Sequence, residues 1–211
     1  LPTRAQQQPG SAAPPKAQIA IPRWRGFNLL DMFTMRSRGD FLEDDFKWIR
    51  DFGFDFVRFP ACHRLWIEGD DNYKIKESML EKLDRGIELA NKSSRHVSLN
   101  FHRGPGDSVN QEFKEPFNLW KDKEALDAFV FHWQLMANRY KGIGRDKLSF
   151  DLINEPPSVG ERMSRADHER VVRTTVAAIR QINPDRLVVA DGISYGNETA
   201  PELADLKIGQ S

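Results

Sequence analysis

Hydrophobic residues follow two alternating spacings along most of this chain. Short runs rich in β-branched and aromatic residues predict strands, at residues 24–30, 54–59, 96–101, 148–153 and 186–191. Between these runs, apolar residues recur at helical spacing and predict helices, at residues 40–52, 78–92, 122–141 and 164–183. Alternation of strands and helices is typical of an α/β protein whose parallel sheet is covered by helices.

The predicted helices carry their own start signals. Ser78 and Glu81 have the spacing of a capping box, while Asp122 and Ser164 stand where the two later helices begin. We therefore expect these helices to start close to those residues.

Side-chain alternation within the strands favours a closed barrel over an open sheet. The third strand with the residue after it has one polar and one apolar face: Ser98, Asn100 and His102 against Val97, Leu99 and Phe101. An open parallel sheet is apolar on both faces, whereas a (β/α)8 TIM barrel can carry polar residues on its inner face. A complete barrel takes ~250 residues. The 211 residues of this chain therefore hold about the first five βα units.

The first residues differ in composition from the rest. Residues 1–18 are rich in Gln, Pro, Ala and Ser and have no hydrophobic periodicity. We expect residues 1–20 to be a disordered leader or linker, with residues 21–211 forming one partial barrel domain. This composition is compatible with a segment that follows a cleaved secretory signal.

Composition limits the classes of partner. The 31 Lys and Arg residues balance 31 Asp and Glu residues, so charge gives no support for nucleic acid or an anionic membrane as a partner. No apolar run approaches the ~18 residues that a membrane span requires. The chain has no glycine-rich phosphate motif and no metal-ligand spacing, and Cys62 is the single cysteine. We expect neither a metal nor a cofactor.

Polar residues stand at the end of every predicted strand. These strand-end residues are Asn28, Asp31, Arg58, His102, Asn154, Glu155 and Asp191. Taken singly, each has a structural explanation, such as a salt bridge for Glu155 or Arg58. Catalytic groups of barrel enzymes lie where strands end, so together these residues indicate a site at one mouth. Two carboxylates flanking a glycosidic bond are the usual means of hydrolysing it, and the other polar groups could hold sugar hydroxyls.

The loops after the strands also carry aromatic residues, whose flat faces suit sugar rings. Trp66, Trp120 and Tyr195 are the candidates for substrate contact. The alternative for Trp120, together with Phe113 and Phe117, is that these rings pack a long loop onto the barrel.

Four segments resemble one enzyme family. RGFNLL at 25–30, VRFP at 57–60, NFHRGPG at 100–106 and FDLINEPP at 150–157 occur in the order and spacing of family 5 glycoside hydrolases. These are cellulase-like retaining β-glycanases on (β/α)8 barrels, and the resemblance covers about residues 21–200.

The resemblance implies a role for each matching residue. Glu155 would be the general acid/base, Asn154 would bind the 2-hydroxyl of the reacting sugar, and Arg58 would hold the nucleophile. His102 would line the subsite of that sugar, and Asn28 is expected to contact substrate.

The family's nucleophile is a second glutamate at the end of strand seven, which lies beyond this chain. Asp191 ends strand five, where the family places no nucleophile. For Glu68, Glu112 and Glu115 we expect solvated surface positions.

The resulting expectation is a secreted or periplasmic retaining β-glycanase that acts on cellulose or another β-glucan, with mannan as the second choice of substrate. This chain alone would be inactive, and the missing C-terminal half of the barrel would be its partner. One alternative is a carbohydrate-binding protein without turnover. Another is an open-sheet nucleotide binder with Asp31 or Asp191 at its switch point, although residues 31–39 contain only Gly39 where a glycine-rich turn would stand.

Overall fold

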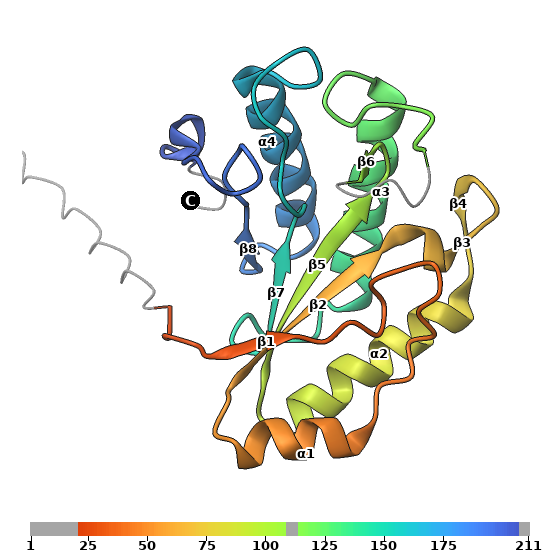
Figure 1. Cartoon of the computed structure of the whole chain (residues 1–211), viewed down its shortest axis with the longest axis vertical. Helices are drawn as coiled ribbons and strands as arrows, with labels where there is room; N and C mark the ends of the chain where they lie inside the picture. The colour runs from red at the N-terminus through yellow and green to blue at the C-terminus, as the bar shows by residue number, and fades with distance from the viewer. Residues whose placement is uncertain (1–20, 109–113, 207–211) are drawn as a thin grey trace, which may run out of the picture.

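Five parallel strands form the centre of the molecule (Figure 1). The computed structural model describes residues 21–108 and 114–206, so the expected leader, Glu112 and Phe113 lie outside the described residues. The strands are β1 (Gly26–Asn28), β2 (Phe56–Cys62), β5 (His96–Gly104), β7 (Leu148–Asp151) and β8 (Leu187–Val189), and they lie side by side in that order. The predicted α/β fold with a parallel sheet is confirmed.

One helix connects each strand to the next parallel strand. The helices are α1 (Glu43–Asp51), α2 (Glu77–Lys92), α3 (Lys123–Arg139) and α4 (Arg165–Ile182). They follow one another around one side of the sheet (Figure 1). This order agrees with the helices predicted from hydrophobic spacing.

The helix starts agree with the sequence only in part. Ser164 caps α4 as predicted, because its side chain accepts a hydrogen bond from the backbone N–H of Asp167. In return, the side chain of Asp167 accepts a hydrogen bond from the backbone N–H of Ser164. The capping box predicted at Ser78 is wrong, since α2 begins at Glu77 after Lys76. The backbone N–H of Lys76 bonds to the carbonyl of Trp66, which fixes the chain one step before Ser78.

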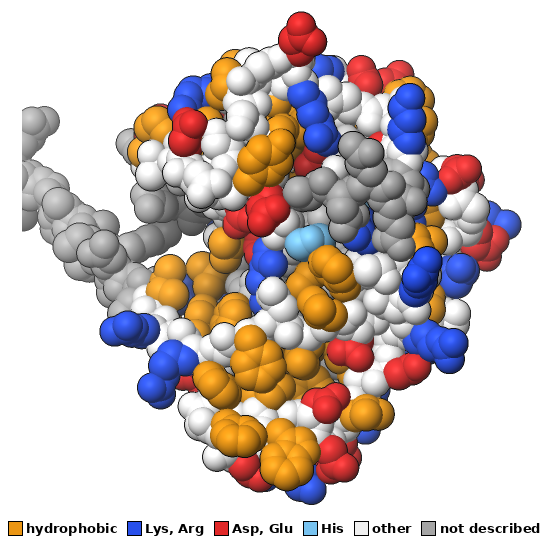
Figure 2. Space-filling model, in the orientation of Figure 1, with side chains coloured by type: hydrophobic (Ala, Val, Ile, Leu, Met, Phe, Trp, Pro, Cys, Tyr) orange, Lys and Arg blue, Asp and Glu red, His pale blue; other side chains and the backbone are white. Residues whose placement is uncertain are grey.

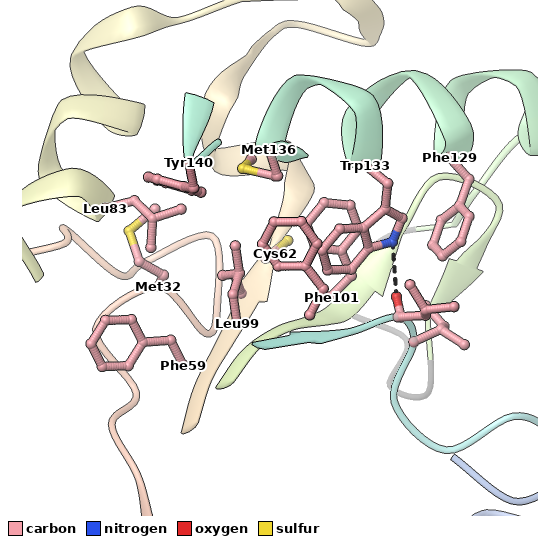
Figure 3. Packing of buried hydrophobic residues seen from close by; sticks show 14 of the residues in the cluster. Met32, Phe59, Cys62, Leu83, Leu99, Phe101, Phe129, Trp133, Met136 and Tyr140 are labelled. Atoms are coloured by element: carbon pink, nitrogen blue, oxygen red, sulfur yellow. Dashed lines mark hydrogen bonds between the residues drawn. The ribbon is translucent and has the colours of Figure 1, made fainter. Parts of the chain in front are cut away.

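The hydrophobic core lies between the sheet and the helices. Phe101 of β5 stacks on Trp133 of α3, with ring centroids 3.9 Å apart. The indole N–H of Trp133 donates to the carbonyl oxygen of Leu152 at 3.2 Å (Figure 3). This contact joins α3 to the chain just before Asn154 and Glu155, so core packing helps to fix the end of β7.

The opposite face of the sheet carries polar side chains. Ser98 and Asn100 of β5 and Ser149 and Asp151 of β7 are buried there. In register, Ser98 lies beside Ser149 and Asn100 beside Asp151. The strands thus have the two unlike faces predicted from side-chain alternation.

Both outer strands have one unpaired edge within the described residues. β1 pairs with β2 alone, and β8 pairs with β7 alone. Apolar side chains on these strands remain accessible: Phe27 is 44% exposed and Val189 is 39% exposed. The described sheet is therefore an open arc.

The structure also contains short elements that the hydrophobic pattern did not predict. They are the 3-10 turns η1 (His63–Trp66) and η2 (Pro201–Leu203), the hairpin β3 (Ile67–Glu68) with β4 (Asp71–Ile75), and β6 (Asp107–Ser108), which pairs with β5.

Candidate active site

Arg58 of β2 lies beside the carboxyl ends of β1 and β7. In the register of the sheet it lies beside Asn28 of β1. Its Nε donates to Oδ2 of Asp151 at 2.8 Å, and a terminal nitrogen donates to Oδ1 of Asn154 at 2.9 Å. The structure therefore brings Arg58 and Asn154 into contact beside Asn28. Arg58 itself is not the strand-end residue that the sequence predicts, because β2 continues from it to Cys62.

Asp151 is a member of this group that sequence reasoning did not single out. Burial raises the pKa of its carboxyl group to about 6, although Arg58 acts in the opposite direction and Asp191 adds to the rise. Asp151 shares the buried polar face of β7 with Ser149. Its contact with Arg58 depends on the register of β2, β5 and β7, which a single sequence does not reveal.

His102 lies at the same edge, half-buried at the end of β5. Burial, together with the positive charges of Arg58 and Arg103, lowers the pKa of its ring to about 4. Near pH 7 the ring is therefore neutral and can both donate and accept a hydrogen bond. It packs against the ring of Phe33, with the centroids 4.6 Å apart. On the face shown in Figure 2, a histidine lies among basic, acidic and apolar side chains.

Three buried polar atoms of the group have unused hydrogen-bonding capacity. Among the described residues, Nδ1 of His102, Nδ2 of Asn154 and Oδ1 of Asp151 make no hydrogen bond. Buried polar groups in proteins are normally paired with protein, water or ligand. The nitrogen atoms of His102 and Asn154 can therefore serve a polar ligand such as a sugar.

Glu155 follows Asn154 directly and is exposed to solvent. Its backbone has a φ of 53°, in the left-handed region that residues other than glycine rarely adopt. Its N–H donates to Oδ2 of Asp191 at 3.1 Å. Glu155 is thus an exposed carboxylic acid that directly follows Asn154, the residue that Arg58 holds.

Tyr195 is the predicted aromatic residue that lies near this edge. Tyr195 is 52% exposed. Its backbone N–H donates to the carbonyl of Pro156 at 2.8 Å, so it lies beside the segment that follows Glu155. A sugar held near Glu155 would have the exposed ring of Tyr195 within the same region.

The two predicted tryptophans lie in the core instead. Trp66 and Trp120 are fully buried. The indole N–H of Trp66 donates to Nδ1 of His132, and that of Trp120 donates to Oδ1 of Asp107. Neither ring has an exposed face for a sugar, which corrects the expectation of substrate contact and favours the packing alternative for Trp120.

The loop carboxylates also differ from one another. Glu115 was expected to be solvated, but only 9% of its side chain is exposed. It accepts hydrogen bonds from Nε of Arg64 and from the backbone N–H of Gly106, so it fixes a loop. Glu68 is exposed and paired with Lys74, as a surface carboxylate.

Within residues 21–108 and 114–206, no cluster of three or more His, Cys, Asp or Glu side chains is arranged to hold a metal ion. In the same part of the chain, no helix combines the length and apolar character of a membrane span.

Known proteins have sequences similar to that of this chain. The family model for cellulase (glycosyl hydrolase family 5) matches residues 16–208. Endoglucanase C of Acetivibrio thermocellus is 33% identical over 194 residues, which cover 90% of this chain and 54% of that protein. Cellodextrinase A of Ruminococcus flavefaciens is 28% identical over 159 residues, covering 75% of this chain and 44% of that protein. This chain spans about half the length of these curated relatives.

Solved structures of glycoside hydrolases are similar to this chain as well. A crystal structure of a glycoside hydrolase superposes with a TM-score of 0.81 at 38% identity, over 87% of this chain and 57% of the other. Endoglucanase Cel5A from the hyperthermophilic Thermotoga maritima superposes with a TM-score of 0.66 at 22% identity, over 84% and 54% of the two chains, and at that identity it shows the fold alone. Cel5A has been crystallised with cellobiose and with mannotriose.

Proposed function

Because this chain belongs to glycosyl hydrolase family 5, we propose that it carries the acid/base half of a retaining β-glycanase active site. The observation that supports this most is the meeting of Arg58 and His102 with Asn154, the residue directly before Glu155. In this proposal Glu155 protonates the leaving oxygen of the glycosidic bond and then removes a proton from the attacking water. Its exposure leaves the carboxyl group free to reach both.

The neighbouring residues hold the sugar and the charges around it. Nδ2 of Asn154 donates to the 2-hydroxyl of the reacting sugar, where hydrogen bonds strengthen in the transition state. Oδ1 of the same side chain is held by Arg58, so the amide has a fixed orientation with its N–H groups available. Neutral His102 offers a second hydrogen bond to the sugar.

Retention requires a second carboxylate about 5–5.5 Å from the first to act as nucleophile. We propose that this group is a glutamate from a part of the barrel that residues 1–211 do not include. Three features support the idea: the unpaired edges of β1 and β8, the fit to about half of each relative, and the use of Asp191 as a hydrogen-bond acceptor for Glu155. On this proposal, residues 1–211 alone hydrolyse nothing.

A β-1,4-glucan is the substrate class that we propose first. Relatives that cover most of this chain are named endoglucanase and cellodextrinase. Mannan is the second choice. We also propose that the protein acts outside the cytoplasm, because a polysaccharide cannot enter a cell and the composition of residues 1–18 suits a segment after a secretory signal. Recovery of the protein in the cytoplasmic fraction of its host would contradict this location.

The test is the hydrolysis of cellotetraose by the protein that carries this chain, followed by proton NMR. Initial release of the β-anomer, with later mutarotation, is the expected result. Initial release of the α-anomer would contradict a retaining mechanism. Binding of cellotetraose without hydrolysis would favour the alternative, a carbohydrate-binding protein on a barrel scaffold.

A further inference from the structure

Three residues with left-handed backbone conformations lie together beside the site. They are Glu155, Ser194 and Tyr195, with φ values of 53°, 55° and 59°. Residues other than glycine adopt this region rarely and keep it where their surroundings fix it. Two of the three belong to the loop after β8, and the third is the proposed acid/base.

Hydrogen bonds from this loop fix the segment 155–157 residue by residue. Oδ2 of Asp191 accepts from the backbone N–H of Glu155 at 3.1 Å. The N–H of Tyr195 donates to the carbonyl of Pro156 at 2.8 Å, and that of Ser194 donates to the carbonyl of Pro157 at 3.3 Å.

Proline has no backbone N–H, so Glu155 provides the one backbone donor of the segment 155–157. That donor is directed to a side chain of the neighbouring strand end. A carboxylate is the strongest acceptor that a side chain can offer a backbone N–H. The bond therefore restrains the peptide plane at Glu155, and with it the direction in which the side chain leaves the backbone.

We propose that Asp191 is a positioning residue for Glu155. It holds the backbone of the acid/base in the left-handed conformation and so aims the carboxyl group at the glycosidic oxygen. This inference rests on the function proposed above, and it gives Asp191 a task other than that of nucleophile. A displacement of ~1 Å at a reacting group can cost about 100-fold in rate.

The experiment compares three variants in the protein that carries this chain, with cellotetraose as substrate, because its sugar leaving group must be protonated as it departs. Asp191→Ala removes the acceptor, and Asp191→Asn keeps an acceptor oxygen at the same place. Asp185→Ala is the matched control, because Asp185 is an exposed aspartate that precedes the same strand. We expect kcat of Asp191→Ala to fall about 10- to 100-fold with KM changed by less than about threefold, because orientation acts on the transition state.

Asp191→Asn should recover most of the lost kcat, and Asp185→Ala should match the wild type. A second measurement does not need turnover: exchange of the Glu155 amide hydrogen should be faster in Asp191→Ala than in Asp191→Asn. If the wild type hydrolyses the substrate and Asp191→Ala has the same kcat, the positioning role is overturned while the proposed function stands. An equal loss of kcat in Asp191→Ala and Asp191→Asn would also overturn the positioning role, because loss of the charge or of local structure would then explain the effect. Failure of the wild type to hydrolyse any β-glycoside would overturn the proposed function first, and the positioning role with it.

Discussion

Nε of Arg58 lies 2.8 Å from Oδ2 of Asp151, and this bond joins β2 to the end of β7, two strands that are not neighbours in the sheet. Only 4% of the Asp151 side chain is exposed. Arg58 thus offsets a buried negative charge while its other arm orients Asn154.

Replacement of Arg58 by methionine should destabilise the protein. It leaves Asp151 buried without its cation, which typically costs about 3–5 kcal/mol in the free energy of unfolding. Urea denaturation at pH 7 measures this loss. The double variant Arg58→Met with Asp151→Asn should recover part of it, because the buried charge is gone. A loss below ~1 kcal/mol in the single variant would mean that the pair contributes little.

The buried carboxyl group of Asp107 should make stability depend on pH. Burial raises its pKa to about 6, with Glu115 adding to the rise and with Arg162 and the indole N–H of Trp120 opposing it. Between pH ~4 and ~6 the folded state then holds more protons than the unfolded state, so this group's contribution to stability falls as pH rises.

The variant Asp107→Asn removes that proton uptake. Relative to the wild type, its free energy of unfolding should rise by about 1–3 kcal/mol between pH 4 and pH 6 and change little above pH 7. Urea denaturation across this range measures the difference. Asp185→Asn, at an exposed position, is the control with a flat difference. If the difference in free energy of unfolding between Asp107→Asn and the wild type were also independent of pH, burial would not raise the pKa of Asp107.

His102 should stay neutral throughout the range in which most enzymes are assayed. Burial and the charge of Arg58 lower its pKa to about 4. Because the unfolded chain takes up this proton more readily, the contribution of His102 to stability falls as pH drops from about 6.5 to about 4. The ring proton shift in NMR, assigned with His102→Gln, should be constant from pH 5.5 to pH 8. A midpoint near 6.5 would contradict the effect of the neighbouring arginines.

Glu155→Gln should abolish most turnover in the complete protein while it preserves glycan binding. General acid/base groups typically contribute about 100- to 10,000-fold to rate, and glutamine has nearly the same shape without the proton. Glu161→Gln is the control, because Glu161 is exposed on the loop that follows. Cellotetraose hydrolysis and calorimetric binding give the two readouts. Hydrolysis near the wild-type rate in Glu155→Gln would exclude Glu155 as the acid.

Tyr195→Asn should weaken binding of cellotetraose about tenfold, or ~1.4 kcal/mol, if the exposed ring stacks on a sugar. Asparagine is the replacement of choice because it tolerates the left-handed backbone at this position. Trp66→Phe serves as the contrast: Trp66 is buried, so its replacement should lower stability and leave affinity unchanged. Equal affinity in Tyr195→Asn and the wild type would remove Tyr195 from the site.

The strands and helices could be predicted because their signals are local. Spacing of apolar residues identified all five parallel strands, and the end of each strand gave a candidate for the site. Contacts across strands have no such signal. Asp151 and Arg58 are 93 positions apart in the sequence, and they pair only because the register of the sheet brings them together.

The sequence also does not show whether a loop residue faces the solvent or the core. Trp66 follows β2 in sequence, as a residue at the mouth would, but the turn η1 directs its ring to Phe101 in the core. Glu115 lies in a polar stretch that suggests solvent, yet Arg64 and Gly106 surround it. In both cases tertiary packing decided what the local pattern could not.

β8 has three residues and one neighbour within the described sheet, yet Asp191 follows it closely. An edge strand of this kind opens at a lower free energy than the core of the fold. Each opening would release Asp191 and with it the orientation of Glu155. On heating, residues 1–211 should therefore lose the bond between Asp191 and the Glu155 amide below the temperature at which their core melts. Pairing of another strand along β8 would move this loss toward the melting temperature, so completion of the barrel would itself fix the backbone of the proposed acid.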